Sequence, residues 1–230
     1  MTVGRAVPTV EPVVTEVHVP PGMLGPDSVS FEVRCFVVAE AGSVVLVDTC
    51  TPGSSEAIGG ALARVGAAWS DVTDIVLTHS HFDHSGGLVE AAKLASGATV
   101  WAGAADVPAI PTIGGRAVRS LAEGDRVGTL RVLHTPGHTP GHVSLLHEAA
   151  SVLLIGDLVG SMDGGLSFGP SAFTADPALS LRSLRRVVDL RADRILFSHG
   201  DEVTDPGIAI RELIDRPEPL DLPRRNVRQA

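Results

Sequence analysis

Aromatic residues are scarce in this chain. They make up 3% of its 230 residues, and tyrosine is absent altogether. Apolar residues nevertheless account for 44% of the sequence, which is enough for a sizeable hydrophobic core. That core must be built from Val, Leu, Ile and Ala, and this composition suits buried strands flanked by helices.

Cysteine is almost as rare, with two residues in the whole chain. Cys35 and Cys50 lie near a predicted antiparallel pair of strands, 29–38 and 44–48. A hairpin turn between these strands places Cys35 opposite Asp48, not opposite Cys50. We therefore predict two reduced thiols and no disulfide, as is usual for a cytosolic protein.

Positive charge is also limited, because 18 Lys and Arg stand against 27 Asp and Glu for a net charge of -9. A nucleic-acid partner would attract a basic surface, so this balance argues against one. No stretch approaches about 18 unbroken apolar residues, and the N-terminal residues lack the apolar core of a signal peptide. We expect a cytoplasmic protein with a small-molecule substrate and neither a membrane nor a nucleic-acid partner; the oligomeric state is not predicted.

The length favours one large α/β domain over residues 1–230, with a frayed tail at 216–230. Strands followed by helices occur in both halves of the chain, which predicts sheets packed in the middle with helices outside. One helix is predicted to begin at Thr51, because a capping residue there precedes a proline. Two segments, 103–128 and 160–175, lack regular periodicity, and long irregular loops in compact domains tend to be functional.

The segment HSHFDH places three histidines and an aspartate at the end of a predicted buried strand. Residues i and i+2 of an extended segment project to the same side, so His79 and His81 can grip one ion together. After Phe82, which we interpret as a packing wedge, the chain must turn, and Asp83 and His84 can then face a second point nearby. Imidazole and carboxylate are ligands for zinc, iron(II) and comparable ions.

Further candidate ligands follow later in the chain. His138 lies in the loop HTPGHTPGH, Asp157 ends the apolar strand LLIGD, and His199 follows the apolar strand residues of LFSHG. A charged or imidazole group directly after apolar strand residues is costly unless it has a partner such as a metal ion. The sequence therefore predicts that these three residues complete a metal site begun by the histidine cluster.

The order of these motifs is specific. HxHxDH, then TPGHTPG, then an apolar strand ending in GD, then a late SHG resembles the metallo-β-lactamase superfamily, over about residues 29–215. Within it, the chain is most similar to the binuclear hydrolases of the glyoxalase II and lactonase type. The resemblance implies an α/β fold, a four-layer αβ/βα sandwich of the metallo-β-lactamase type, with the metals at one edge between the two sheets.

The resemblance also implies two divalent metal ions, most simply zinc, with iron or manganese as alternatives. Each ion would take three ligands of its own and share one carboxylate with the other ion. By position these ligands are His79, His81 and His138 for the first ion, Asp83, His84 and His199 for the second, and Asp157 between them.

The implied mechanism is hydrolysis by a hydroxide that bridges the two ions, because a bound metal can lower the pKa of water from 15.7 to about 7. Asp83 and Asp157 are the carboxylates that we assign to this catalytic centre, with Asp157 as a bridging ligand and not a general base. Asp48 matches an aspartate that supports the site from behind the ligands, and His134 is a second candidate for such support. The usual glycine after VDT is Cys50 here, which affects the turn more than the chemistry.

The expected reaction is hydrolysis of an ester, thioester or lactone. Antibiotic hydrolysis is disfavoured because the best-known β-lactamases carry Cys where Asp157 stands. Glyoxalase II proper adds a helical domain for which this chain is too short, and many lactonases use a tyrosine that this chain lacks.

Two alternatives stay open. Persulfide dioxygenases resemble the same pattern but use a single iron, held at the positions of His79, His138 and Asp157. A phosphodiesterase of the same superfamily is the other.

The pocket walls are expected to come from the two irregular segments. Arg116 or Arg119 is a candidate to hold a substrate carboxylate. The candidate apolar contacts are Ile110, Ile113, Met162, Phe168 and Phe173.

Overall fold

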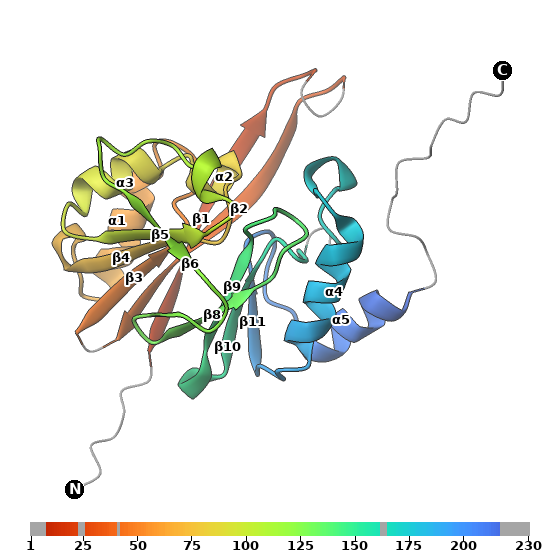
Figure 1. Ribbon diagram of the computed structural model, residues 1–230. Coiled ribbons are helices and arrows are strands. Elements are labelled where there is room, and N and C mark those ends of the chain that lie inside the picture. Colours follow the sequence, from red (N-terminus) through yellow and green to blue (C-terminus); the bar gives the residue numbers. More distant parts are fainter. Residues whose placement is uncertain (1–7, 23–25, 41, 162–164, 217–230) are drawn as a thin grey trace, which may run out of the picture.

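The computed structural model describes residues 8–22, 26–40, 42–161 and 165–216. Two sheets lie face to face in the middle of the molecule, and helices cover the outer face of each (Figure 1). This is the four-layer arrangement predicted from the motifs. None of the helices in the described ranges combines the length and the apolar character needed to cross a membrane.

The first sheet has six strands in the order β1-β2-β3-β4-β5-β6. Strands β1 to β3 are antiparallel, and β3 to β6 run parallel to one another. Their bounds are β1 Thr9–Val19, β2 Val29–Glu40, β3 Ser43–Val47, β4 Val72–Leu77, β5 Thr99–Gly103 and β6 Val118–Leu121.

The second sheet has five strands in the order β11-β10-β9-β8-β7. Only the pair β10 and β11 is parallel. The bounds are β7 Arg126–Val127, β8 Leu130–His134, β9 Val143–His147, β10 Val152–Gly156 and β11 Arg194–Phe197.

The helices fall into two outer layers. α1 and α3 cover the first sheet, α4 and α5 cover the second, and the short α2 follows β4 at the edge (Figure 1). They are α1 Ser55–Arg64, α2 Phe82–Ser85, α3 Leu88–Leu94, α4 Pro177–Val188 and α5 Pro206–Asp215, with 3-10 turns at Trp69–Asp71, Val107–Ala109, Glu148–Ala150 and Ser171–Phe173.

Strand β2 shows why two sheets and two helical layers form. Its alternate residues Cys35 and Val37 pack under α1 and α3, whereas Phe36 and Val38 face the second sheet. All four are buried, so the strand is apolar on both faces, as a central strand between two layers must be. A third cluster, which includes Leu153, seals the second sheet against α4 and α5.

Sequence patterns located most of these elements, but some boundaries were wrong. Strand β1 was not predicted, and β6 lies inside the segment 103–128 that lacked visible periodicity. Helix α1 begins at Ser55 and not at Thr51. Gly53 adopts φ +89°, a left-handed conformation that a right-handed helix cannot contain, so the helix starts after it. The predicted hairpin register is confirmed by the pairing of Phe36 with Val47, and Cys35 and Cys50 are buried free thiols.

Parallel strands bring their carboxyl ends to the same edge. β3 and β4 end there in the first sheet, and β10 and β11 end there in the second. The residues that follow these strands are Asp48, Thr78, Asp157 and Ser198. Each sheet therefore delivers polar side chains to one edge of the sandwich.

Candidate metal centre

The loop after β4 carries the histidine cluster. His81 is still extended, with φ -62° and ψ 151°, and α2 starts at the next residue. The change from strand to helix points His79 and His81 at one place, and it turns Asp83 and His84 toward another. This is the turn that the sequence required after the second histidine.

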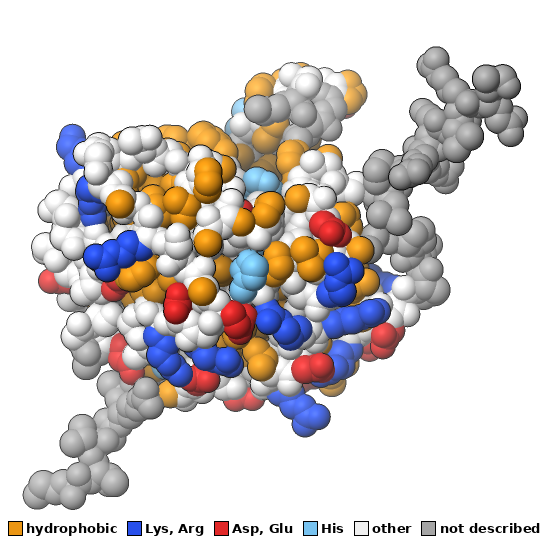
Figure 2. All heavy atoms as spheres, viewed as in Figure 1, with side chains coloured by type: hydrophobic (Ala, Val, Ile, Leu, Met, Phe, Trp, Pro, Cys, Tyr) orange, Lys and Arg blue, Asp and Glu red, His pale blue; other side chains and the backbone are white. Residues whose placement is uncertain are grey.

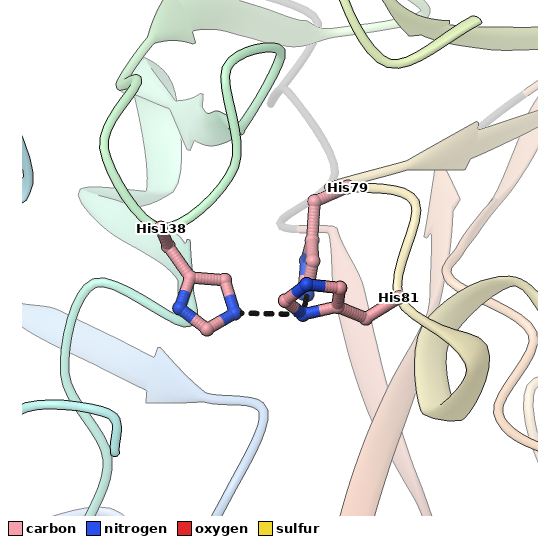
Figure 3. Close-up of side chains that lie close together, drawn as sticks. All are labelled: His79, His81 and His138. Carbon is pink, nitrogen blue, oxygen red and sulfur yellow. Dashed lines mark hydrogen bonds between the residues drawn. The ribbon is translucent and has the colours of Figure 1, made fainter. Parts of the chain in front are cut away.

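The first group of side chains consists of His79, His81 and His138. The Nδ1 atom of His81 lies 3.1 Å from Nε2 of His79 and 3.0 Å from Nε2 of His138 (Figure 3). His79 and His138 are 0% and 2% exposed. These three residues come from different sheets, because His138 lies in the loop between β8 and β9. Three imidazole nitrogens thus converge on one buried point.

The second group consists of Asp83, His84 and His199. The Oδ2 atom of Asp83 lies 3.6 Å from Nε2 of His84 and 3.5 Å from Nε2 of His199. Asp157 lies between the two groups. Its carboxylate oxygens are 3.4 Å from His84, 3.3 Å from His199 and 3.5 Å from His138. One carboxylate therefore reaches ligand atoms of both groups.

The outward nitrogens of His79 and His84, two rings that follow β4, are already bonded. Thr78 donates its hydroxyl to Asp48, at 2.8 Å, so the same oxygen accepts from Nδ1 of His79, at 3.1 Å. Nδ1 of His84 donates to Asp48, at 3.0 Å. Both rings therefore carry a proton on Nδ1, and Nε2 faces the centre.

The same holds for the rings from the second sheet. Nδ1 of His199 donates to the backbone carbonyl of Glu32, at 2.8 Å. Nδ1 of His138 lies 3.3 Å from the hydroxyl of Thr174, which itself donates to the carbonyl of Pro170. Backbone carbonyls only accept, so these contacts also leave both Nε2 atoms directed inward.

The centre contains buried polar atoms that fit a cation. Among the described residues, Nε2 of His84 and Oδ1 of Asp157 are buried without a hydrogen-bond partner. Leaving a donor or acceptor unsatisfied in this way costs about 1–3 kcal/mol. Both atoms face the shared centre, 3.4 Å apart, so a divalent ion there would satisfy both.

The protonation states of the central groups also favour a bound cation. Burial lowers the pKa of His79 well below its usual value and that of His138 to about 4, so both rings are neutral near pH 7. Burial raises the pKa of Asp157, but the charges of His84 and His199 outweigh it and hold that pKa well below the usual value. Burial lowers the pKa of His84 and His199 as well, but the charge of Asp157 outweighs it and raises the pKa of both rings, so a cation bound there would take the place of their protons. Imidazole and carboxylate donors arranged in this way suit zinc or iron(II).

Asp48 lies directly behind the ligands and is 1% exposed. Besides His84, it accepts from the backbone N–H of Thr78, at 2.7 Å, and from the Thr78 hydroxyl. The predicted supporting contact is therefore made to His84 directly and to His79 through Thr78.

Replacing Asp48 by asparagine is expected to weaken metal binding about 10- to 100-fold, the usual cost of losing a partner that orients a ligand. An amide keeps one acceptor oxygen but presents N–H to groups that themselves donate. Competition with a coloured chelator measures the affinity. Asp71→Asn is the matched control, because Asp71 caps a turn at the opposite end of β4. Equal affinity in the Asp48 variant and the wild type would contradict the prediction.

The other histidines near the motifs have different surroundings. His134 ends β8, and its backbone bonds to Glu123 and Arg186; no described contact of its ring reaches the ligands. His142 is fully buried behind Asp157, whose backbone N–H donates to Nε2 of His142, at 3.0 Å. His142 is a supporting residue that the sequence analysis missed.

A cavity of about 450 Å³ opens beside His81 and His138. Both irregular segments contribute to its wall, through Ala105 and Ala109 from one and Phe173 from the other. Figure 2 shows histidine side chains reaching the surface in the middle of the view, between the two halves of the sandwich. His81 is only half-buried where it lines this cavity, so the site is accessible from solvent.

Of the described residues predicted as apolar contacts, Phe173 alone lines this cavity. Ile113 is buried in the core of the first sheet, with Ile110 packed against it. Phe168 packs against the cluster under α4 and α5. Met162 lies outside the described residues.

The two candidate arginines also point elsewhere. The guanidinium of Arg116 donates to the backbone carbonyls of Ala92 and Ala98, and that of Arg119 stacks over Trp101 at 5.4 Å. The structure thus gives no support for a substrate carboxylate at either. The packing role expected for Phe82 is wrong, since its side chain is 65% exposed beside the ligands.

The chain matches the family model described as the metallo-beta-lactamase superfamily over residues 30–199. Its curated relatives include a hydroxyacylglutathione hydrolase of Rhodospirillum rubrum, 34% identical over 82% of this chain and 68% of that protein. A hydroxyacylglutathione hydrolase of Methylobacterium is 32% identical over 75% of this chain and 67% of that protein, and one of Cereibacter sphaeroides is 37% identical over 58% of this chain and 49% of that protein.

Solved structures agree with these matches. A metallo-beta-lactamase family protein from Thermus thermophilus is 26% identical, with a TM-score of 0.65 over 88% of this chain and 78% of that one. Another protein, solved in a di-iron-bound form, is 28% identical, with a TM-score of 0.63 over 81% and 94%. The architecture of this chain is therefore shared with both of these proteins.

Proposed function

The chain belongs to the metallo-β-lactamase superfamily and is a metal-dependent hydrolase, and we propose that it uses two metal ions to cleave a thioester, ester or lactone. One observation carries the proposal: a single carboxylate, Asp157, lies within 3.3–3.5 Å of ring nitrogens from both ligand groups. The second cluster, on the far side of that carboxylate, supplies the further donors that a second ion would need.

The residues fit two ions divided as the motifs predicted. His79, His81 and His138 would hold one, and Asp83, His84 and His199 would hold the other, with Asp157 shared. Zinc is the ion that we propose, with iron or manganese as alternatives, because imidazole and carboxylate donors suit all three. When bound, such ions supply ionised water near neutral pH and polarise the substrate carbonyl.

The chain's own contribution is to orient the ligands and to shape the pocket. Four of the five histidines have a partner that orients the ring: Thr78 for His79, Asp48 for His84, Thr174 for His138 and the Glu32 carbonyl for His199. The cavity beside His81 and His138 would receive the substrate, with small apolar side chains and Phe173 against its acyl portion. No serine or cysteine nucleophile is required for this chemistry.

The first substrate to test is hydroxyacylglutathione, for which several curated relatives are named. The test uses the purified full chain loaded separately with zinc, iron or manganese, with metal content quantified for each preparation. Each is assayed on hydroxyacylglutathione, other thioesters, an acyl lactone and a phosphodiester, and for oxygen uptake with a persulfide.

We expect close to two ions per chain and turnover of a thioester, ester or lactone. A single iron with oxygen uptake would replace the proposal with the dioxygenase alternative, in which His79, His138 and Asp157 hold that iron. Turnover of the phosphodiester alone would favour the other alternative.

A further inference from the structure

Asp106 is a buried carboxylate that the mechanism above does not use. It lies in the loop after β5, is 2% exposed and holds the loop in a tight turn, with its N–H bonded to the Gly103 carbonyl and its carbonyl accepting from Ala109, both at 2.9 Å. A carboxyl group this deep in a protein needs hydrogen-bond partners.

Its carboxylate has three donors, and all come from the loops that carry the first ligand group. Oδ2 accepts from the backbone N–H of Ser80, at 2.9 Å, and from the hydroxyl of Thr139, at 2.7 Å. Oδ1 accepts from the backbone N–H of Gly141, at 2.7 Å. Ser80 sits between His79 and His81, and Thr139 follows His138, so one carboxylate ties both ligand loops together.

These loops belong to different sheets. One backbone hydrogen bond joins their bases, from the N–H of Val143 to the carbonyl of Thr78 at 2.8 Å, and the Asp106 carboxylate adds bonds next to His81 and His138 themselves. The backbones meet closely at two glycines. A side chain on Gly103 would place Cβ 1.8 Å from the carbonyl oxygen of Gly141, and one on Gly141 would place Cβ 2.4 Å from the Asp106 nitrogen. The Asp106 carboxylate therefore lies where the backbones of two loops are tightly packed. This contact is close to the point where Nδ1 of His81 and Nε2 of His138 are 3.0 Å apart.

We propose that Asp106 is a positioning residue that sets the separation of His81 and His138 and thereby the affinity of the first metal position. It does so without contact to the ion, since all three bonds of its carboxylate are directed at the loops. The inference rests on the proposed function only in needing two metal positions, not in needing a particular substrate.

The test is a zinc titration of wild type and Asp106→Ala, with a coloured chelator as competitor. The wild type is expected to bind two ions of similar tightness. In the variant we expect one ion to bind as before and the other about 10- to 100-fold more weakly, the range found when ligand-supporting contacts are lost. Activity should fall at limiting zinc and return close to the wild-type value at saturating zinc.

Two further variants separate positioning from general damage. Thr139→Val removes one donor to Asp106 and keeps the two backbone donors, so it should weaken the same metal position by a smaller factor, and it gives an answer even if Asp106→Ala fails to fold. Asp74→Ala is the matched control, because this carboxylate of β4 accepts from Trp101 at 2.7 Å and has no contact with a ligand loop. The Asp74→Ala variant should bind zinc at both metal positions with the wild-type affinities.

Unchanged affinities at both positions in the folded Asp106 or Thr139 variant would overturn the inference and leave the proposed function intact. Equal weakening of both positions would also overturn it, because it would indicate a general loss of order. A wild-type chain that binds fewer than two ions would instead overturn the proposed function and the inference together.

Discussion

Replacing Asp157 by alanine is expected to remove at least one metal ion and to lower turnover by about a thousandfold. The reason is that, among the described residues, Asp157 is the one carboxylate paired with rings of both ligand groups, at 3.4 Å from His84 and 3.5 Å from His138. Two ions would lose the negative charge between them. Metal-based stabilisation of a transition state amounts to several kcal/mol, and about 4 kcal/mol corresponds to a thousandfold.

Metal analysis of the purified variant and its kcat/KM on the best substrate measure the effect. Asp157→Asn keeps the shape of the side chain and removes its charge. We expect this variant to lose metal and turnover as the alanine variant does, because an amide carries no negative charge. Asp189→Ala is the control, since Asp189 forms an exposed ion pair with Arg211 that should contribute little. A variant with two ions and wild-type turnover would remove Asp157 from the centre.

Removing the metal is expected to abolish activity and to lower the melting temperature by about 8–16 °C. An ion present at about 1,000 times its Kd stabilises the folded state by about 4.1 kcal/mol. Each kcal/mol shifts the melting temperature of a domain this size by about 2–4 °C. The structural source is the buried cluster itself, where ring nitrogens of His79, His81 and His138 face one another.

The measurement compares melting curves of the chain after chelation and after zinc is added back, with activity recorded in parallel. Asp157→Ala should show a much smaller shift on zinc addition, which ties the shift to this site and not to surface binding. Full activity in excess chelator, or equal melting temperatures with and without zinc, would mean that the cluster is not a metal centre.

Local patterns gave the sequence analysis its successes. The apolar residues of 29–38 predicted strand β2. The pattern of a capping residue before a proline, used at Thr51, recurs at Asp176 and Pro177, where α4 begins and the Asp176 side chain accepts from the backbone N–H of Leu179. Strand ends were equally visible, because Asp157 follows a run of apolar residues. These features depend on neighbours along the chain, so sequence alone could reveal them.

The failures have two different causes. The segment around Arg116 and Ile113 gave no periodic signal, because its side chains are placed by β5 and α3 and not by their own neighbours. The pocket wall could therefore not be assigned from those loops. Strand β1 was missed although Val13 and Val17 alternate with exposed residues, so in that case the signal was present and was overlooked.

The sequence by itself determined the types of ligand, their places at strand ends and the fold that gathers them, because spacing and apolar runs are properties of short stretches of chain. The tertiary structure alone decided which nitrogen of each ring faces the centre. It also decided that Asp106 joins the two ligand loops. Both depend on partners far away in the sequence, such as the Glu32 carbonyl for His199, and only the packing of one sheet on the other brings such partners within hydrogen-bond distance.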